Sequence, residues 1–281
     1  MAKDHLFILY GLINDVVNGN GNDLEVTTLD IEKAFDKLNL KYTLNDMVDK
    51  LPDEHENDKI ALLFKANETT KFAVKTPFGL TERVEKNEVV QQGGSWGGIL
   101  CSNTVDKTTE TSVEEEEELY KYKNELPIPD LSYVYDRIGI SECGLPTLER
   151  NVKVTSRIEM NRLKFNVGKA EEKSKCLKMH VSRNKNHKKE CLDLIVRGKP
   201  MESVNEITFL GDIVSSCGKN INNIRERVSK GIGIINQIFV ILDSICFGKQ
   251  FFEMALLLRS SMLLNSILYN SCVCTVFPLP T

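Results

Sequence analysis

The chain opens with apolar positions at helical spacing. Within residues 5–18 they recur every three or four positions, which predicts an amphipathic helix. The residues concerned are Leu6, Leu9, Tyr10, Ile13, Val16 and Val17. A segment rich in glycine and asparagine, residues 18–23, then ends the helix and turns the chain. An apolar, β-rich run follows and stops at Asp30, so the first helix leads into a strand that ends on an acid.

Residues 33–66 are expected to be helical, with a break around Pro52, where acidic residues gather. Residues 71–91 then alternate between apolar and polar side chains on either side of the Pro77 to Gly79 turn. Alternation on both sides of a turn residue cluster is typical of a hairpin. We therefore predict a β-hairpin after the second helical segment.

The second half of the chain mixes both kinds of element. Residues 145–162 are predicted to form another helix, and residues 163–214 short strands joined by basic turns. From Asn220 onward apolar positions again recur near helical spacing, which predicts helix as far as the Pro-containing tail. The pattern as a whole predicts an α+β protein with a helical C-terminal part.

Composition narrows the class of protein. A chain of 281 residues can bury a sizeable core and form one or two domains. The formal net charge is −4, yet residues 150–189 carry thirteen basic and three acidic side chains. This strip could face phosphate groups or could be an ordinary solvated surface. The longest apolar stretch, residues 251–277, is broken by charged and amide side chains, so no membrane span is expected.

Eight cysteines are scattered along the chain without a secretory leader before them. We expect reduced thiols in an intracellular protein, cytoplasmic or nuclear. Four of the chain's Cys and His residues follow the spacing C-x3-H-x6-H-x3-C: Cys176, His180, His187 and Cys191. These residue types bind zinc, but the paired C-x2-C spacing of familiar zinc modules is absent, so incidental placement in a Lys-rich segment is the alternative.

Two acids could meet at one edge of the predicted sheet. Asp30 ends an apolar strand, and Asp136 follows a short β-rich run after Tyr135. Phosphoryl transfer onto a nucleic acid strand uses two divalent ions held by clustered carboxylates, because hard cations prefer oxygen ligands. Two acids brought together from a strand end and a neighbouring turn would supply such ligands. If they share a site, burial and mutual repulsion are expected to raise the pKa of at least one of them.

Five segments, in order, resemble the motifs of the palm of a reverse transcriptase of the kind encoded by non-LTR retrotransposons. They read LDIEKAFDKL, VVQQGGSWGGIL, SYVYDRIGI, KFNVGKAEEKSKCLKMHV and FLGDIVSSCGKNINNIRERVSKG. The resemblance implies that Asp30 is the principal Mg²⁺ ligand, assisted by the Ile31 carbonyl. It also implies that Phe35 packs under the incoming sugar and that Gln92 and Gly93 lie against the nucleotide and template.

The third segment usually carries two adjacent aspartates, and this chain has Tyr135 and Asp136 there. A neutral phenol supplies no anionic ligand, so we predict a degraded two-metal site formed by Asp30 and Asp136, and impaired catalysis. The fourth segment implies a lysine that protonates departing pyrophosphate, either Lys175 or Lys169. The fifth implies a primer grip at Phe209, Leu210 and Gly211, followed by the start of a thumb.

The resemblance implies an α+β polymerase-type palm, an antiparallel sheet backed by helices, over residues 1–215. A helical thumb-like remnant would occupy residues 216–281, and the fingers expected before residue 1 would be missing. RNA template, DNA primer and dNTP are the implied partners, and RNA-templated DNA synthesis is the implied activity. The alternative is a non-catalytic RNA-binding module that uses the basic strip; its RNA affinity would fall steeply with salt.

Overall fold

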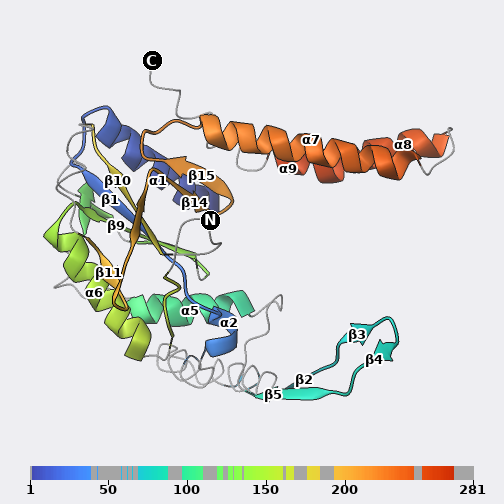
Figure 1. Ribbon diagram of the computed structural model, residues 1–281, viewed down its shortest axis with the longest axis horizontal. Helices are drawn as coiled ribbons and strands as arrows, with labels where there is room; N and C mark the ends of the chain where they lie inside the picture. The colour runs from blue at the N-terminus through green and yellow to red at the C-terminus, as the bar shows by residue number, and fades with distance from the viewer. Residues whose placement is uncertain are drawn as a thin grey trace. The chain divides into compact units, whose positions relative to one another are not determined.

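The computed structural model describes residues 2–38, 43, 58, 62, 65, 69–87, 97–109, 119–122, 126–128, 130–134, 136–160, 163–167, 176–183, 193–243 and 249–268 (Figure 1). The chain divides into two compact units. Unit 1 consists of Met1–Asp23, Met179–Asn186 and Val204–Thr281, and unit 2 of Leu24–Lys178 and His187–Ser203. The sequence division expected between residues 215 and 216 stays a prediction.

The main sheet has five strands in the order β13-β10-β1-β9-β8. Their bounds are β1 Leu24–Leu29, β8 Leu131–Tyr133, β9 Asp136–Glu142, β10 Leu177–Val181 and β13 Glu202–Val204. β1 and β9 run antiparallel from the pair Leu24 and Glu142 to the pair Leu29 and Arg137. β8 and β9 form a hairpin that closes at Tyr133 and Asp136. The strand predicted before Asp30 and the short strand before the 135–136 turn are both confirmed.

β1 is a central strand, and its sequence reflects that position. Five of its six residues are buried, including the polar Glu25 and Thr27, so both faces of the strand are covered. β1 has a hydrogen-bonded neighbour on each side, β10 and β9, as the backbone of a buried strand requires. The hydroxyl of Thr28 accepts a hydrogen bond of 2.8 Å from the backbone N–H of Leu177 in β10. This fixes the rigid element that ends at Asp30.

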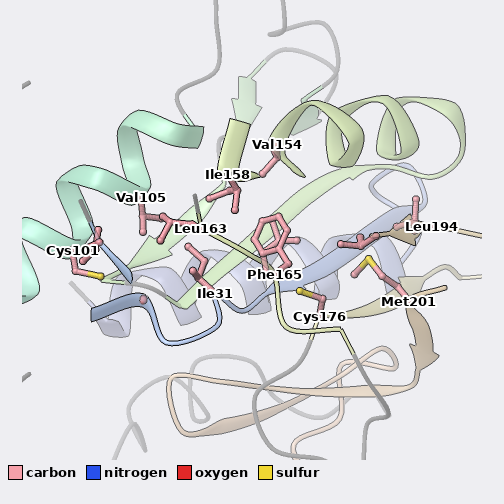
Figure 2. Close-up of a cluster of buried hydrophobic side chains, with 14 of the residues drawn as sticks. Ile31, Cys101, Val105, Val154, Ile158, Leu163, Phe165, Cys176, Leu194 and Met201 are labelled. Carbon is pink, nitrogen blue, oxygen red and sulfur yellow. The ribbon is translucent and has the colours of Figure 1, made fainter. Parts of the chain in front are cut away.

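The core of unit 2 lies where helices meet the sheet end (Figure 2). Helix α5, Gly97–Thr109, contributes Cys101 and Val105, and helix α6, Leu145–Met160, contributes Val154 and Ile158. Phe165, in the segment after α6, is fully buried among them together with Ile31. The helix predicted over residues 145–162 is confirmed over Leu145–Met160, and residues 161 and 162 lie outside the described part of the chain. Of the helix predicted over residues 33–66, the structure describes α2, Ala34–Lys37, and helical residues at 43, 58, 62 and 65.

Residues 69–87 form the predicted hairpin. β2, Thr69–Phe72, pairs with β5, Val84–Asn87, and nearer the tip β3, Lys75–Thr76, pairs with β4, Gly79–Leu80. The turn falls at Pro77 and Phe78, as the sequence indicates. Further two-stranded pairings join β6, Tyr120–Tyr122, to β7, Leu126–Ile128, and β11, Ile195–Val196, to β12, Lys199–Pro200.

Unit 1 contains α1, Ala2–Val17, the hairpin of β14, Glu206–Phe209, and β15, Asp212–Ser215, and a helical segment. That segment comprises α7 Ile221–Asp243, α8 Lys249–Leu258, the π-helical η3 Arg259–Leu264 and α9 Asn265–Leu268. α1 buries five of the six predicted apolar positions, and Val17 is partly buried. The hydroxyl of Tyr10 donates a 3.3 Å hydrogen bond to the carbonyl of Ile213. Within the described part of the chain, no helix combines the length and apolarity needed to cross a membrane.

Candidate active site

Asp30 and Asp136 stand opposite each other at the end of the central strand pair. The last registered pair of β1 and β9 joins Leu29 to Arg137, so the next position along both strands brings Asp30 across from Asp136. Opposed residues of an antiparallel pair have their side chains on the same face, with Cβ atoms about 4.5–5.5 Å apart. The two acids expected to meet are therefore brought together.

Backbone hydrogen bonds indicate which kind of antiparallel pair Asp30 and Asp136 form. The carbonyl of Asp30 accepts a 2.9 Å hydrogen bond from the N–H of Asn166, and the N–H of Glu32 donates to Lys164 at 2.8 Å. These groups face the segment 163–167, which pairs with β1's extension through the bridge between Ile31 and Phe165. The carbonyl of Asp30 thus faces residues 163–167, which is the backbone orientation expected of a non-hydrogen-bonded pair with Asp136, the kind in which side chains come closest.

A transverse row of polar side chains results. Tyr133 lies opposite Asp136 in the β8–β9 hairpin, and Asn166 lies opposite Asp30 across the Ile31 bridge. Because paired positions across a sheet share a face, the row runs Tyr133, Asp136, Asp30, Asn166. An amide beside the carboxylates offers a neutral donor or acceptor without adding charge.

The electrostatics of the pair agree with its geometry. Burial raises the pKa of the Asp136 carboxyl above its ordinary value, and the negative charge of Asp30 raises it further. This is the direction expected from the sequence for two acids sharing a site, and the expectation is confirmed. A divalent cation would remove the repulsion, and carboxylate oxygens are ligands that Mg²⁺ accepts. The residues present therefore fit such an ion.

No third ligand of the usual kinds completes the pair within the residues that the structure describes, where no group of three or more His, Cys, Asp or Glu could hold a metal ion. Backbone oxygen is a further source of ligands. Because Asp30 and Glu32 direct their backbone groups toward residues 163–167, the carbonyl of Ile31 faces the opposite edge, on which β9 lies. Its role as a metal ligand stays a prediction.

Cys176 is a buried neighbour of Asp30. Its Sγ is 3.8 Å from the carbonyl oxygen of Asp30, and its N–H donates a 2.9 Å hydrogen bond to Asn166. Burial, together with the charge of Asp30, raises the pKa of the Cys176 thiol to about 12. The group is therefore a neutral thiol at pH 7, a packing residue and not a thiolate ligand.

The turn that carries Asp136 is anchored to the core. Val134, between Tyr133 and Asp136, adopts the left-handed conformation with φ 61°, which is unfavourable for a β-branched residue. Its side chain packs against the core cluster of unit 2, and a Cβ built on Gly98 in α5 would lie 3.9 Å from its Cγ2. Packing thus holds a strained turn in place next to the carboxylates.

A buried ion pair braces the same hairpin. Arg137 donates from Nε to Asp130 Oδ2 at 2.6 Å and also pairs with it through Nη2. The two side chains are 7% and 4% exposed. Because Arg137 follows Asp136 directly, its side chain points to the other face of the sheet. Asp130 consequently engages the guanidinium away from the Asp30 and Asp136 carboxylates.

The other predicted nucleotide contacts are placed as follows. Phe35 lies in α2 and packs, partly buried, against the core cluster that also contains Ile31. Gln92, Gly93 and Tyr135 lie outside the described residues, as do the rival lysines, Lys169 and Lys175. Their roles stay predictions.

The predicted primer grip is a tight hairpin in unit 1. Leu210 and Gly211 form its two-residue turn with φ 49° and 80°, and Phe209 pairs with Asp212 across it. Positive φ at both turn positions is the geometry that matches strand twist in such hairpins. Phe209 is buried, whereas Gly211 is exposed. Asp212 is fully buried and forms an ion pair with Arg227 of α7, which fastens the hairpin to the helix.

The structure describes only some of the residues in the predicted zinc site and in the basic strip. His180 is buried, with Nε2 3.9 Å from Asp23 Oδ2, and His187 and Cys191 lie outside the described residues. Zinc binding therefore stays a prediction. Lys178, counted in the basic strip, is buried with Nζ 3.8 Å from Asp193 Oδ1, so it does not face solvent phosphate.

Sequence reasoning missed two contributors to the site. Asn166 belongs to the quoted fourth segment, but nothing in that segment alone shows that it pairs with Asp30. The Asp130 and Arg137 pair was also missed. The arginine directly before the apolar run Ile138 to Ile140 was a usable signal, because a buried guanidinium requires a partner.

Solved structures similar to this chain include telomerases. Telomerase from Candida tropicalis in complex with a TWJ fragment of telomeric RNA is 14% identical, with a TM-score of 0.49, and 97% of this chain covers 48% of that one. The Candida albicans telomerase complex with a TWJ fragment is 14% identical at a TM-score of 0.45, with 97% and 43% covered. Apo telomerase from Candida tropicalis truncated from its C-terminal domain is 16% identical at 0.46, with 77% and 38% covered.

This chain therefore spans less than half the length of each of these telomerases. All three TM-scores lie below 0.5, a level at which similarity does not define a common fold. No protein-family model matches the chain. No curated protein matches it either.

Proposed function

We propose that this chain is a palm of the reverse transcriptase type whose nucleotidyl-transfer site is reduced to two carboxylates, Asp30 and Asp136. One observation carries the proposal: these acids oppose each other at the end of β1 and β9, where burial and, after it, the charge of Asp30 raise the pKa of Asp136. The order of the five sequence segments suggests the family. A sheet in which β1, β9 and β8 pair antiparallel, with helices packed at its end, is compatible with that family.

In this proposal Asp30 and Asp136 would hold Mg²⁺, and the Ile31 carbonyl would add a neutral oxygen. The chemistry supplied there would be a lower pKa for a primer hydroxyl and charge neutralisation on the triphosphate of a dNTP. Cys176 keeps one flank of the site neutral, and Asn166 can donate a hydrogen bond to a carboxylate or a nucleotide. Phe35, packed on the core cluster, would support the sugar.

Catalysis is impaired in this proposal because Tyr135 replaces an aspartate. Two divalent ions facing one fewer carboxylate repel each other with less compensation, and a neutral phenol contributes no anionic oxygen. The loss of one metal ligand removes several kcal/mol of transition-state stabilisation, which corresponds to a rate loss on the order of 100-fold or more. The ancestral activity would be RNA-templated DNA synthesis within a retrotransposon.

Primer extension tests the proposal. A DNA primer annealed to an RNA template is incubated with dNTPs and either Mg²⁺ or Mn²⁺, using the native chain, Tyr135→Asp and the double variant Tyr135→Asp with Asp30→Asn. We expect Tyr135→Asp to extend the primer on the order of 100-fold faster than the native chain, and the double variant to be inactive. Equal extension by the native chain and Tyr135→Asp would contradict the impairment. Extension that survives Asp30→Asn would contradict the site.

The alternative function, RNA binding without catalysis, predicts no extension by any variant, together with RNA affinity that falls steeply with salt. Absence of extension by Tyr135→Asp would favour it, because the impairment could then not be assigned to Tyr135.

A further inference from the structure

The hairpin over residues 69–87, here called the arm, contains a surface that the proposed site does not use. β2 and β5 form its base and β3 and β4 its tip. Nearly every arm residue whose burial is described is exposed. A two-stranded hairpin with both faces in water is only marginally stable alone. A defined conformation at its tip therefore needs local hydrogen bonds, a partner, or both.

Local bonds hold the tip turn in one conformation. The hydroxyl of Thr76 accepts a 3.2 Å hydrogen bond from the N–H of Phe78 and donates one of 2.8 Å to the carbonyl of Gly79. Pro77 fixes its own φ between them, and Gly79 has φ 124°, which only glycine adopts without strain. The turn is thus preorganised, which lowers the entropy lost when it binds.

This preorganised turn presents an aromatic ring to solvent. Phe78 is 99% exposed, so the tip holds a large apolar side chain entirely in water. Below it, the hydroxyl of Thr81 accepts a 2.9 Å hydrogen bond from the N–H of Val74, and the N–H of Thr81 donates a 3.0 Å bond to the Val74 carbonyl. These hydrogen bonds therefore hold the two sides of the hairpin together below the ring, and the ring is accessible for stacking.

The charge around the ring is positive on a chain that is negative overall. The arm has four basic and two acidic side chains, a net charge of +2, whereas the whole chain has −4. Lys71 at the base is neutralised by Glu85, with Nζ 2.5 Å from Oε1. No ion pair between described residues involves Lys75 or Arg83, the cations nearest the tip.

We propose that the arm tip binds single-stranded RNA, with a base stacked on Phe78 and the flanking phosphates on Lys75 and Arg83. An exposed aromatic between cations is the arrangement by which single strands are held without sequence preference. Glu82 next to Arg83 limits the charge and argues against a purely electrostatic contact. The inference rests on the proposed function only in its choice of nucleic acid; the arm is separate in sequence from Asp30 and Asp136.

Fluorescence tests the stacking directly. The Phe78→Trp variant is made in a Trp96→Phe background, which leaves the introduced indole as the single tryptophan, and is titrated with a single-stranded oligouridylate. Stacking predicts quenching that saturates with RNA and weakens with salt. The matched control, Val84→Trp in the same background, places an indole at the base of the arm and is expected to show no quenching.

Affinity measurements separate the contribution of the Phe78 ring to RNA binding from that of the cations. Phe78→Ala is expected to weaken oligouridylate binding about 5- to 150-fold, whereas Phe78→Tyr retains it. Arg83→Gln reduces the slope of log affinity against log salt by about 0.7. Lys71→Gln, which removes a cation already paired with Glu85, serves as the matched control and changes affinity least.

Three results would overturn the inference. The native chain could fail to bind the oligonucleotide; it could bind it with the same affinity after Phe78→Ala and with no quenching of Phe78→Trp; or Phe78→Ala could abolish self-association seen by sedimentation, which would assign the tip to a second copy. Asp30→Asn distinguishes this inference from the proposed function, because it is expected to leave the quenching of the Phe78→Trp indole unchanged. Loss of primer extension together with unchanged quenching would therefore leave RNA binding by the arm intact.

Discussion

Asp136 lies across the sheet from Asp30, one position beyond the last registered pair of β1 and β9, and the charge of Asp30 contributes to the raised pKa of Asp136. About a hundred residues of chain separate the two acids. The fold nevertheless places them on one face, where like charges oppose folding unless a cation or a proton intervenes. Acids held together at such a cost are common at functional sites.

The Asp136→Asn substitution is expected to stabilise the cation-free protein by roughly 0.2–1 kcal/mol at pH 7, because it removes a like-charge pair across strands. Burial and Asp30 raise the pKa of Asp136 in the folded state above that of the unfolded chain. Between the pKa of Asp136 in the unfolded chain and its higher pKa in the folded protein, the folded state binds more protons than the unfolded state. The free energy of unfolding of the native protein therefore falls as pH rises through this range. Urea unfolding from pH 4 to 7 should show a variant-minus-native difference that grows with pH. A difference that shrinks with rising pH would contradict the pairing.

The Asp130→Ala substitution is expected to destabilise the protein by about 3–5 kcal/mol, because it leaves the guanidinium of Arg137 buried without its partner. Both side chains are less than a tenth exposed. The control is Glu85→Ala, which breaks the exposed pair with Lys71 and is expected to cost about 0.2–1 kcal/mol. Chemical unfolding of both variants gives the comparison. Similar losses for the two would mean that the Asp130 and Arg137 pair is not buried in solution.

Two glycines are expected to respond to alanine in opposite directions. A Cβ on Gly139 in β9 would lie 2.6 Å from Thr27 Oγ1 and 3.7 Å from Asp130 Oδ1, so Gly139→Ala overpacks the centre of the sheet and costs about 1–3 kcal/mol. A Cβ on Gly233 in α7 meets nothing within 4 Å, so Gly233→Ala gains about 1 kcal/mol from helix propensity. Thermal unfolding measures both, and a stabilised Gly139→Ala would refute the described packing of β1 on β9.

Alkylation is expected to separate two cysteines. Burial holds the pKa of Cys176 at about 12, whereas Cys217 is exposed. Iodoacetamide at pH 8, read by peptide mass spectrometry, should modify Cys217 and leave Cys176 unmodified until urea unfolds the protein. Rapid modification of Cys176 in the folded protein would show that the flank of Asp30 is open to solvent.

Local patterns predicted the elements of this fold well. The helix over residues 5–18, the hairpin around Pro77 and the helix over residues 145–162 each depend on spacing and turn chemistry within a short window, and each is present. The strand ending at Asp30 was recognised for the same reason. Each of these predictions needed only neighbours in sequence.

The composition of the site needed information that no short window contains. That Asn166 lies opposite Asp30 follows from the bridge of Ile31 to Phe165, which is set by packing of Phe165 into the core. The burial of Lys178, which composition alone assigned to a solvated strip, follows from its place in β10. Charge counts along a sequence do not distinguish a strand residue that points inward from one that points outward.

Manganese binding followed by electron paramagnetic resonance measures the proposed cation site itself. The native chain is expected to bind Mn²⁺, Asp30→Asn and Asp136→Asn each to weaken binding on the order of 10- to 100-fold, and Tyr135→Asp to tighten it. Glu85→Ala, a control that removes a carboxylate from the arm, is expected to bind as the native chain does. Unchanged Mn²⁺ affinity in Asp30→Asn and Asp136→Asn would contradict the claim that these two carboxylates form a cation site.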